Sequence, residues 1–115
     1  MIDFSIRFED GEALVIDKPA GLPLDPPRAG GDSLENHLDA LRFGFQREPH
    51  PVHRLDQDTS GCLLLARNPK ALKRFSAAFE AREVEKVYLG IVAGEVQGES
   101  GTIELALSKI SSAEK

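Results

Sequence analysis

One stretch near the middle of the chain constrains its fold more than any other. It runs from Pro51 to Gly61 (PVHRLDQDTSG) and leads directly into the apolar residues 62–66 (CLLLA). The apolar half is typical of a buried strand. The polar half places a histidine, an arginine and two carboxylates beside that strand, which costs free energy unless partners or function offset it. We therefore interpret the rest of the chain as scaffold for this stretch.

The size and composition of the chain are those of an ordinary small globular domain. Its 115 residues allow one core, or a part of something larger, and 41% of them are hydrophobic and 29% charged. No apolar run approaches membrane-spanning length, so we expect no membrane partner. The first residues lack the pattern of a signal peptide, and the single cysteine suits a reducing compartment. These features predict a cytoplasmic protein.

Charge is distributed unevenly along the chain. The net charge is −5, which argues mildly against a nucleic-acid partner for the chain as a whole. Residues 51–86, however, hold 7 basic and 5 acidic residues and are the only net-positive segment. A local basic face of this kind can bind phosphate even on an acidic protein.

The first half of the chain predicts a hairpin followed by a helix. Residues 4–8 alternate apolar and polar side chains, and residues 13–16 form a short apolar run after a turn. A loop rich in proline and glycine follows. Asp32 and Glu35 have the spacing of a capping box, and leucines recur behind them at helical spacing. This pattern predicts an amphipathic helix over residues 33–43.

The second half predicts a strand over residues 61–67 and a helix over residues 69–82. Asn68-Pro69 is a strong helix start, with asparagine as the cap and proline in the first turn. Two further strands are expected over residues 84–92 and 102–107. The fold class is therefore α+β, a mixed and mainly antiparallel sheet with flanking helices in a single domain over residues 1–115.

Two carboxylates in the central stretch are candidates for chemistry. In an extended segment Asp56 and Asp58 face the same side, with carboxyl groups roughly 5–7 Å apart, the range used in glycosidic chemistry. A hydrolase of glycosidic bonds is therefore one possible function. The simpler interpretation is a turn, because Asp-Thr-Ser-Gly is favourable turn chemistry.

Three further side chains each allow a functional and a simpler interpretation. Arg54 is either a donor to phosphate or a salt-bridged surface residue. His53 is either a general base or a hydrogen-bonded residue at a strand edge. Tyr88, the single tyrosine, is either a ring that stacks on a planar substrate or an ordinary sheet aromatic.

Other chemistry is weakly supported. His50 and His53 lie three apart, but the prolines around them exclude the helix on which such a pair shares a metal, so no metal site is predicted. No glycine-rich phosphate loop is present, and Cys62 is expected to be a small buried hydrophobe.

The helix predicted over residues 69–82 carries four cations on its outer face: Lys70, Lys73, Arg74 and Arg82. This face is either a binding surface for an anionic partner or a solvated surface.

The central motif also resembles that of a known family. His53-Arg54-Leu55-Asp56, followed by Thr59-Ser60-Gly61, resembles the signature of the RluA-type RNA pseudouridine synthases. Three flanking segments agree in order and spacing: residues 17–23 (DKPAGLP), residues 86–89 (KVYL) and residues 101–103 (GTI).

The resemblance implies an isomerase without a cofactor that converts uridine in RNA, ribosomal or transfer, to pseudouridine. Asp56 matches the catalytic aspartate, Arg54 the arginine that fills the space left by the flipped base, and Tyr88 the tyrosine that packs on the uracil. His53, Thr59 and Lys86 lie in matching segments and are candidate RNA contacts.

The family's catalytic domain is longer than this chain. The resemblance therefore implies the N-terminal portion of that domain, without an S4-like RNA-binding module and without the later basic partner of the aspartate. An incomplete and inactive fragment that binds RNA or a partner is the first alternative. An unpaired sheet edge would then favour a homo-oligomer.

Overall fold

The structure, a computed structural model, describes residues 4–91, 93–94, 98 and 101–102. Its centre is a four-stranded antiparallel sheet in the order β1-β2-β4-β3. The strands are β1 (Ile6–Glu9), β2 (Ala13–Lys18), β3 (His50–Pro51) and β4 (Gly61–Ala66). The predicted α+β class is confirmed, and β1 with β2 forms the expected hairpin.

One face of the sheet carries the hydrophobic core. Leu14 pairs with Leu65 and Ile16 with Leu63, and all four side chains are fully buried. Directly opposed residues of an antiparallel pair share a face, so these four form one apolar patch. Six leucines from the connecting segments cover it: Leu22, Leu24, Leu34, Leu38, Leu41 and Leu55.

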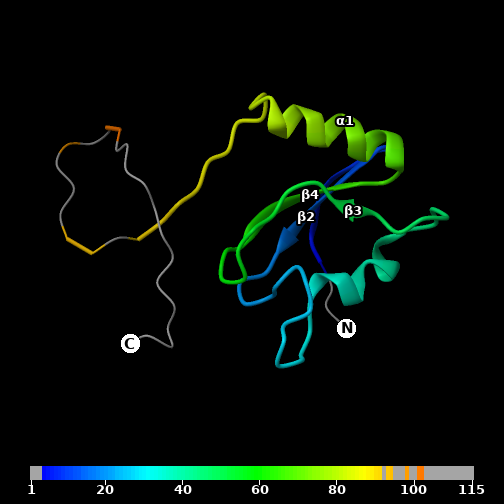
Figure 1. Cartoon of the computed structure of the whole chain (residues 1–115), viewed down its shortest axis with the longest axis horizontal. Helices are drawn as coiled ribbons and strands as arrows, with labels where there is room; N and C mark the ends of the chain where they lie inside the picture. The colour runs from blue at the N-terminus through cyan, green and yellow to red at the C-terminus, as the bar shows by residue number, and fades with distance from the viewer. Residues whose placement is uncertain (1–3, 92, 95–97, 99–100, 103–115) are drawn as a thin grey trace.

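The helix α1 (Pro69–Glu80) runs along the other side of the sheet (Figure 1). It begins as predicted, because the Asn68 side chain accepts a 2.7 Å hydrogen bond from the Ala71 amide. Ala71 is buried against the sheet, and Phe75 and Phe79 are half-buried. Because α1 covers this face only in part, Cys62 on β4 is exposed and the expectation that it is buried is wrong.

The helix predicted over residues 33–43 is wrong as to type and length. The segment instead forms two 3-10 turns, Leu34–His37 and Asp39–Leu41. The amides of Leu34 and Glu35 donate to the carbonyls of Pro23 and Leu24. The Asp32 carboxylate bonds its neighbour Ser33 and the side chains of Asn36 and His37, so no capping box forms. Hydrogen bonds to Pro23 and Leu24, outside the segment, therefore take the place of the first turn of an α-helix.

The strand predicted over residues 84–92 is absent from the part that the structure describes. Residues 84–91 are irregular and exposed and lead away from the sheet (Figure 1). Val87, Leu89 and Ile91 have the strand pattern, but among the described residues they find no strand to pair with. Residues 103–107 of the last predicted strand, and Val92, lie outside the described residues.

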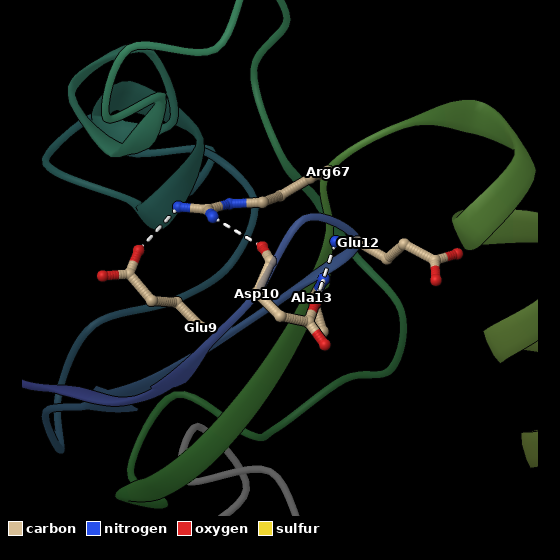
Figure 2. A network of polar contacts seen from close by, with 5 residues as sticks. All are labelled: Glu9, Asp10, Glu12, Ala13 and Arg67. Atoms are coloured by element: carbon tan, nitrogen blue, oxygen red, sulfur yellow. Dashed lines mark hydrogen bonds and ion pairs between the residues drawn. The ribbon is translucent and has the colours of Figure 1, made fainter.

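A polar network fixes the β1–β2 turn to the end of β4 (Figure 2). Arg67 is buried and donates to the Asp10 carbonyl at 2.7 Å and to the Glu9 carboxylate at 2.9 Å. The Asp10 carboxylate in turn accepts from the amides of Glu12 and Ala13. The network holds one end of the β2–β4 pair, and the opposite end, where Lys18 pairs with Gly61, borders the central motif.

Candidate functional site

The central motif forms the connection between β3 and β4. Leu55 is buried in the core, whereas Arg54, Asp56 and Asp58 on either side of it are exposed. The Thr59 amide donates to the Asp56 carbonyl at 3.0 Å, so the chain turns directly after Asp56. One apolar anchor and one turn thus present the Asp56 carboxylate at the surface.

The turn contradicts the two-carboxylate arrangement expected from the sequence. That expectation requires an extended segment from Asp56 to Asp58, and the backbone turns at Gln57 and Asp58 instead. Burial lowers the pKa of Lys18, and the charge of Asp58 opposes that shift. The turn interpretation of Asp-Thr-Ser-Gly is the one that the structure adopts.

The ammonium group of Lys18 ties the motif to the loop after β2. This side chain is fully buried, and its Nζ donates to three backbone carbonyls: Pro19 at 2.8 Å, Leu22 at 2.8 Å and Gln57 at 3.0 Å. The Gly21 amide adds a bond to the Gln57 carbonyl at 2.7 Å. The two loops are therefore held together around one cation.

Lys18 is the residue that sequence analysis missed. Burial lowers its pKa from the ordinary value, and the charge of Asp58 opposes that shift. The available signal was a lysine at the end of a strand, followed by the loop Pro-Ala-Gly. Gly21 adopts a φ of +93°, a backbone conformation that favours glycine, so the loop can curl back toward Lys18.

Arg54 is held by an ion pair at the rim of a cavity. Its guanidinium lies 2.9 Å from the Asp25 carboxylate, and the two side chains are 71% and 67% exposed. The cavity has a volume of about 440 Å³ and is also lined by Glu35, Glu48 and His53. At this exposure the pair contributes little to stability, so Arg54 is available to a stronger anionic partner.

His53 directly precedes Arg54 in the chain and is half-buried. Its Nε2 accepts a hydrogen bond from the Leu64 amide of β4 at 3.1 Å, and its ring stacks on Phe79 of α1 with centroids 4.9 Å apart. The structure thus places His53 between the sheet and the helix.

The other predicted site residues are spread more widely. Thr59 is half-buried beside the turn, and Lys86 lies with its Nζ 5.3 Å from the Phe79 ring centroid. Tyr88 is 59% exposed and lies on the irregular segment 84–91, which leads away from the sheet (Figure 1). The reason is that residues 84–91 lack strand pairing.

The described residues offer no metal centre and no membrane-spanning helix. Within them no three histidine, cysteine, aspartate or glutamate side chains gather as metal ligands. None of their helices is long and apolar enough to cross a bilayer.

Comparisons with known proteins agree on one family. The family model described as RNA pseudouridylate synthase matches residues 12–115. An uncharacterized RNA pseudouridine synthase of Zymomonas mobilis is 56% identical over 107 residues, which cover 93% of this chain and 49% of that protein. The dual-specificity RNA pseudouridine synthase RluA of Vibrio parahaemolyticus is 39% identical, over 89% of this chain and 40% of its own length.

A solved structure is similar as well. Human RNA pseudouridylate synthase domain containing 4 superimposes with a TM-score of 0.59 at 28% identity, over 68% of this chain and 30% of that one. The chain thus spans about half the length, or less, of the proteins that it matches.

Proposed function

This chain belongs to the RNA pseudouridylate synthase family, and on that basis we propose that it isomerises uridine to pseudouridine in RNA. The observation that carries the proposal is the Asp56 carboxylate, exposed on a turn that Leu55 and the buried Lys18 hold in place. In this proposal the chain is the N-terminal portion of a catalytic domain.

The proposed reaction breaks the bond between uracil N1 and ribose C1′ and forms a bond from C5 to C1′. The uracil gains a proton at N1 and loses the one at C5, so the product is an isomer and no cofactor is required. The ionised Asp56 carboxylate acts at the sugar, where positive character develops as the base departs. Its exposure leaves room for a nucleotide to approach.

A uridine inside a helix must leave the base stack before its sugar can react. We propose that Arg54 exchanges its weak ion pair with Asp25 for contacts to the RNA at the vacated position. Tyr88 can pack on the uracil only when residues 84–91 fold back toward the sheet. We propose that Thr59 and Lys86 also contact the RNA.

The proposed partner is structured RNA, ribosomal or transfer. Two observations support it: Lys70 and Lys73 are exposed on α1, and residues 51–86 are the only net-positive segment. We propose the cytoplasm as the compartment, because a single cysteine suits reducing conditions.

A binding module without catalysis is the second candidate. Val87, Leu89 and Ile91 are almost wholly exposed, and a partner or further residues of the same protein would bury them. A homo-oligomer through an exposed sheet edge is one form of this candidate, with β1 and β3 as the edges. Sedimentation over a wide concentration range tests it, since a monomer at all concentrations removes the oligomer.

The identity of the product tests the proposed function. Ribosomal and transfer RNA transcripts are incubated with the chain, and their nucleosides are separated by liquid chromatography, which resolves uridine from its isomer, before mass spectrometry. Pseudouridine that forms with wild type and with Asp58→Asn, but not with Asp56→Asn, supports the isomerase. Free uracil and abasic sites would show a hydrolase, and unchanged RNA that binds to the chain would favour the binding module.

A further inference from the structure

The imidazole of His53 continues the hydrogen-bond ladder of the sheet where the backbone of β3 leaves it. β3 pairs with β4 only through His50 and Pro51, and the next bond runs from the Val52 amide to the Leu64 carbonyl at 2.9 Å. The Leu64 amide has no backbone partner there and donates to His53 Nε2 at 3.1 Å. A side chain thus takes the place of a ladder carbonyl.

This bond determines the protonation of the ring. A ring nitrogen that accepts from an amide carries no proton, so the neutral imidazole must carry its proton on Nδ1. His53 is itself part of the motif and directly precedes Arg54. One neutral imidazole therefore links β4 to the backbone beside the motif arginine.

The surroundings of His53 favour the neutral form. Its pKa is lowered from 6.5 chiefly by burial and further by the charge of Lys86, and the backbone bond with Arg54 opposes the shift. On the helix side its ring stacks on Phe79, beside which Lys86 lies. On the cavity side the other titratable or charged groups are Asp25, Glu35, Glu48, His50 and Arg54.

We propose that His53 is a positioning residue that, as a neutral imidazole protonated on Nδ1, joins β4, α1 and the motif and so orients Arg54 and Asp56 for the proposed isomerisation. The inference rests on the proposed function for its consequence but not for the bridge itself. A protonated ring presents two N–H groups, so it turns a donor toward the donating Leu64 amide and breaks the bridge.

The pH dependence follows from the direction of the shift. Because the folded chain binds the His53 proton more weakly than the unfolded chain, the bridge is fully present well above pH 6.5. It is lost as the pH falls through the folded value. Arg54 and Asp56 are then freed from their fixed orientation.

The first test is nuclear magnetic resonance of the ¹⁵N-histidine-labelled chain, which needs no activity. We expect the His53 ring to show an unprotonated Nε2 at pH 7.5 and to titrate below 6.5, with the Leu64, Arg54 and Asp56 amides moving at the same midpoint. His50→Gln, three residues away on the same cavity, is the matched control, and the signal lost in His53→Gln assigns His53 among the three histidines. A ring protonated on Nε2, or motif amides that do not follow its titration, overturns the proposal.

The second test compares two substitutions by their pH profiles. His53→Gln keeps an acceptor for the Leu64 amide and does not titrate, whereas His53→Phe keeps the stacking on Phe79 and removes the acceptor. We expect turnover about tenfold lower for His53→Phe, near wild type for His53→Gln at pH 8, and a shallower acid limb for His53→Gln. Equal turnover and unchanged profiles in both variants contradict the positioning role. If wild type forms no pseudouridine, the proposed function fails, and the resonance experiment still decides the bridge.

Discussion

At the scale of single residues, the site depends on one buried cation. The Nζ of Lys18 has three carbonyl partners, which come from two loops and include the residue after Asp56. Removal of the ammonium group leaves these acceptors without their donor in the interior, and such losses are expensive. The position of Asp56 therefore depends on a fully buried residue that bonds the backbone of the next residue along the chain.

Substitution of Lys18 tests this dependence. We expect Lys18→Met, which keeps the length of the side chain, to lower the free energy of unfolding by about 3 kcal/mol. The exposed Lys70→Met on α1 is the control and should change it by less than about 0.5 kcal/mol. Urea unfolding followed by circular dichroism measures both, and equal effects would show that the buried ammonium has no special role.

The ion pair between Arg54 and Asp25 makes a prediction about RNA. Asp25→Asn removes the carboxylate that competes with phosphate for Arg54, so we expect RNA to bind about two- to fivefold more tightly at low salt. The gain should shrink as salt is added. Fluorescence anisotropy with labelled RNA measures the affinity.

Glu35→Gln is the matched control for this experiment, because it removes a charge from the same cavity without breaking the Arg54 pair. An equal gain in both variants would mean that net charge, and not the release of Arg54, determines the affinity.

At the scale of elements, sequence analysis correctly predicted those features that residues close together in the sequence determine. α1 begins at Asn68-Pro69 because the cap and the proline act within one turn. β2 and β4 follow from short apolar runs that pair with each other. Residues 33–43 were predicted wrongly because amides at their start bond the distant carbonyls of Pro23 and Leu24, which no periodicity reveals.

In the candidate site, too, some features follow from local sequence and others from contacts between distant segments. The exposed Asp56 and the turn after it follow from local turn chemistry, and the motif itself identified the family. The burial of Lys18 and the bridge through His53 depend on contacts between segments far apart in sequence. The pattern of residues 84–91 is that of a strand, but a strand forms only where another strand pairs with it.

The β1–β2 turn makes a prediction about acid stability. Hydrogen bonds from the amides of Glu12 and Ala13 lower the pKa of Asp10 from 3.8. A lowered carboxyl pKa stabilises the folded chain above the unfolded value, and that stability is lost as the pH falls through the folded value. We therefore expect Asp10→Asn to lower the melting temperature at pH 7 and the difference from wild type to shrink below about pH 3.8.

Thermal unfolding from pH 7 to pH 2.5 measures this effect. Glu85→Gln, an exposed substitution outside the regular elements, is the control. A difference between Asp10→Asn and wild type that stays constant over the whole range would contradict the assigned role of the ionised carboxylate.

At the scale of the whole molecule, the chain spans 49% of its Zymomonas relative. Its exposed apolar residues Val87, Leu89 and Ile91 follow α1. The net charge is −5, and residues 51–86 form the only net-positive segment, so we expect RNA binding to weaken steeply with salt. In the proposed reaction, Asp56 on its fixed turn initiates the isomerisation.

Release of tritium from RNA labelled at uracil C5 tests the role of Asp56, because the proton at C5 leaves only when C5 bonds to the sugar. We expect release with wild type and with Asp58→Asn, and a loss of at least about a thousandfold with Asp56→Ala. Release by Asp56→Ala at the wild-type rate would contradict it.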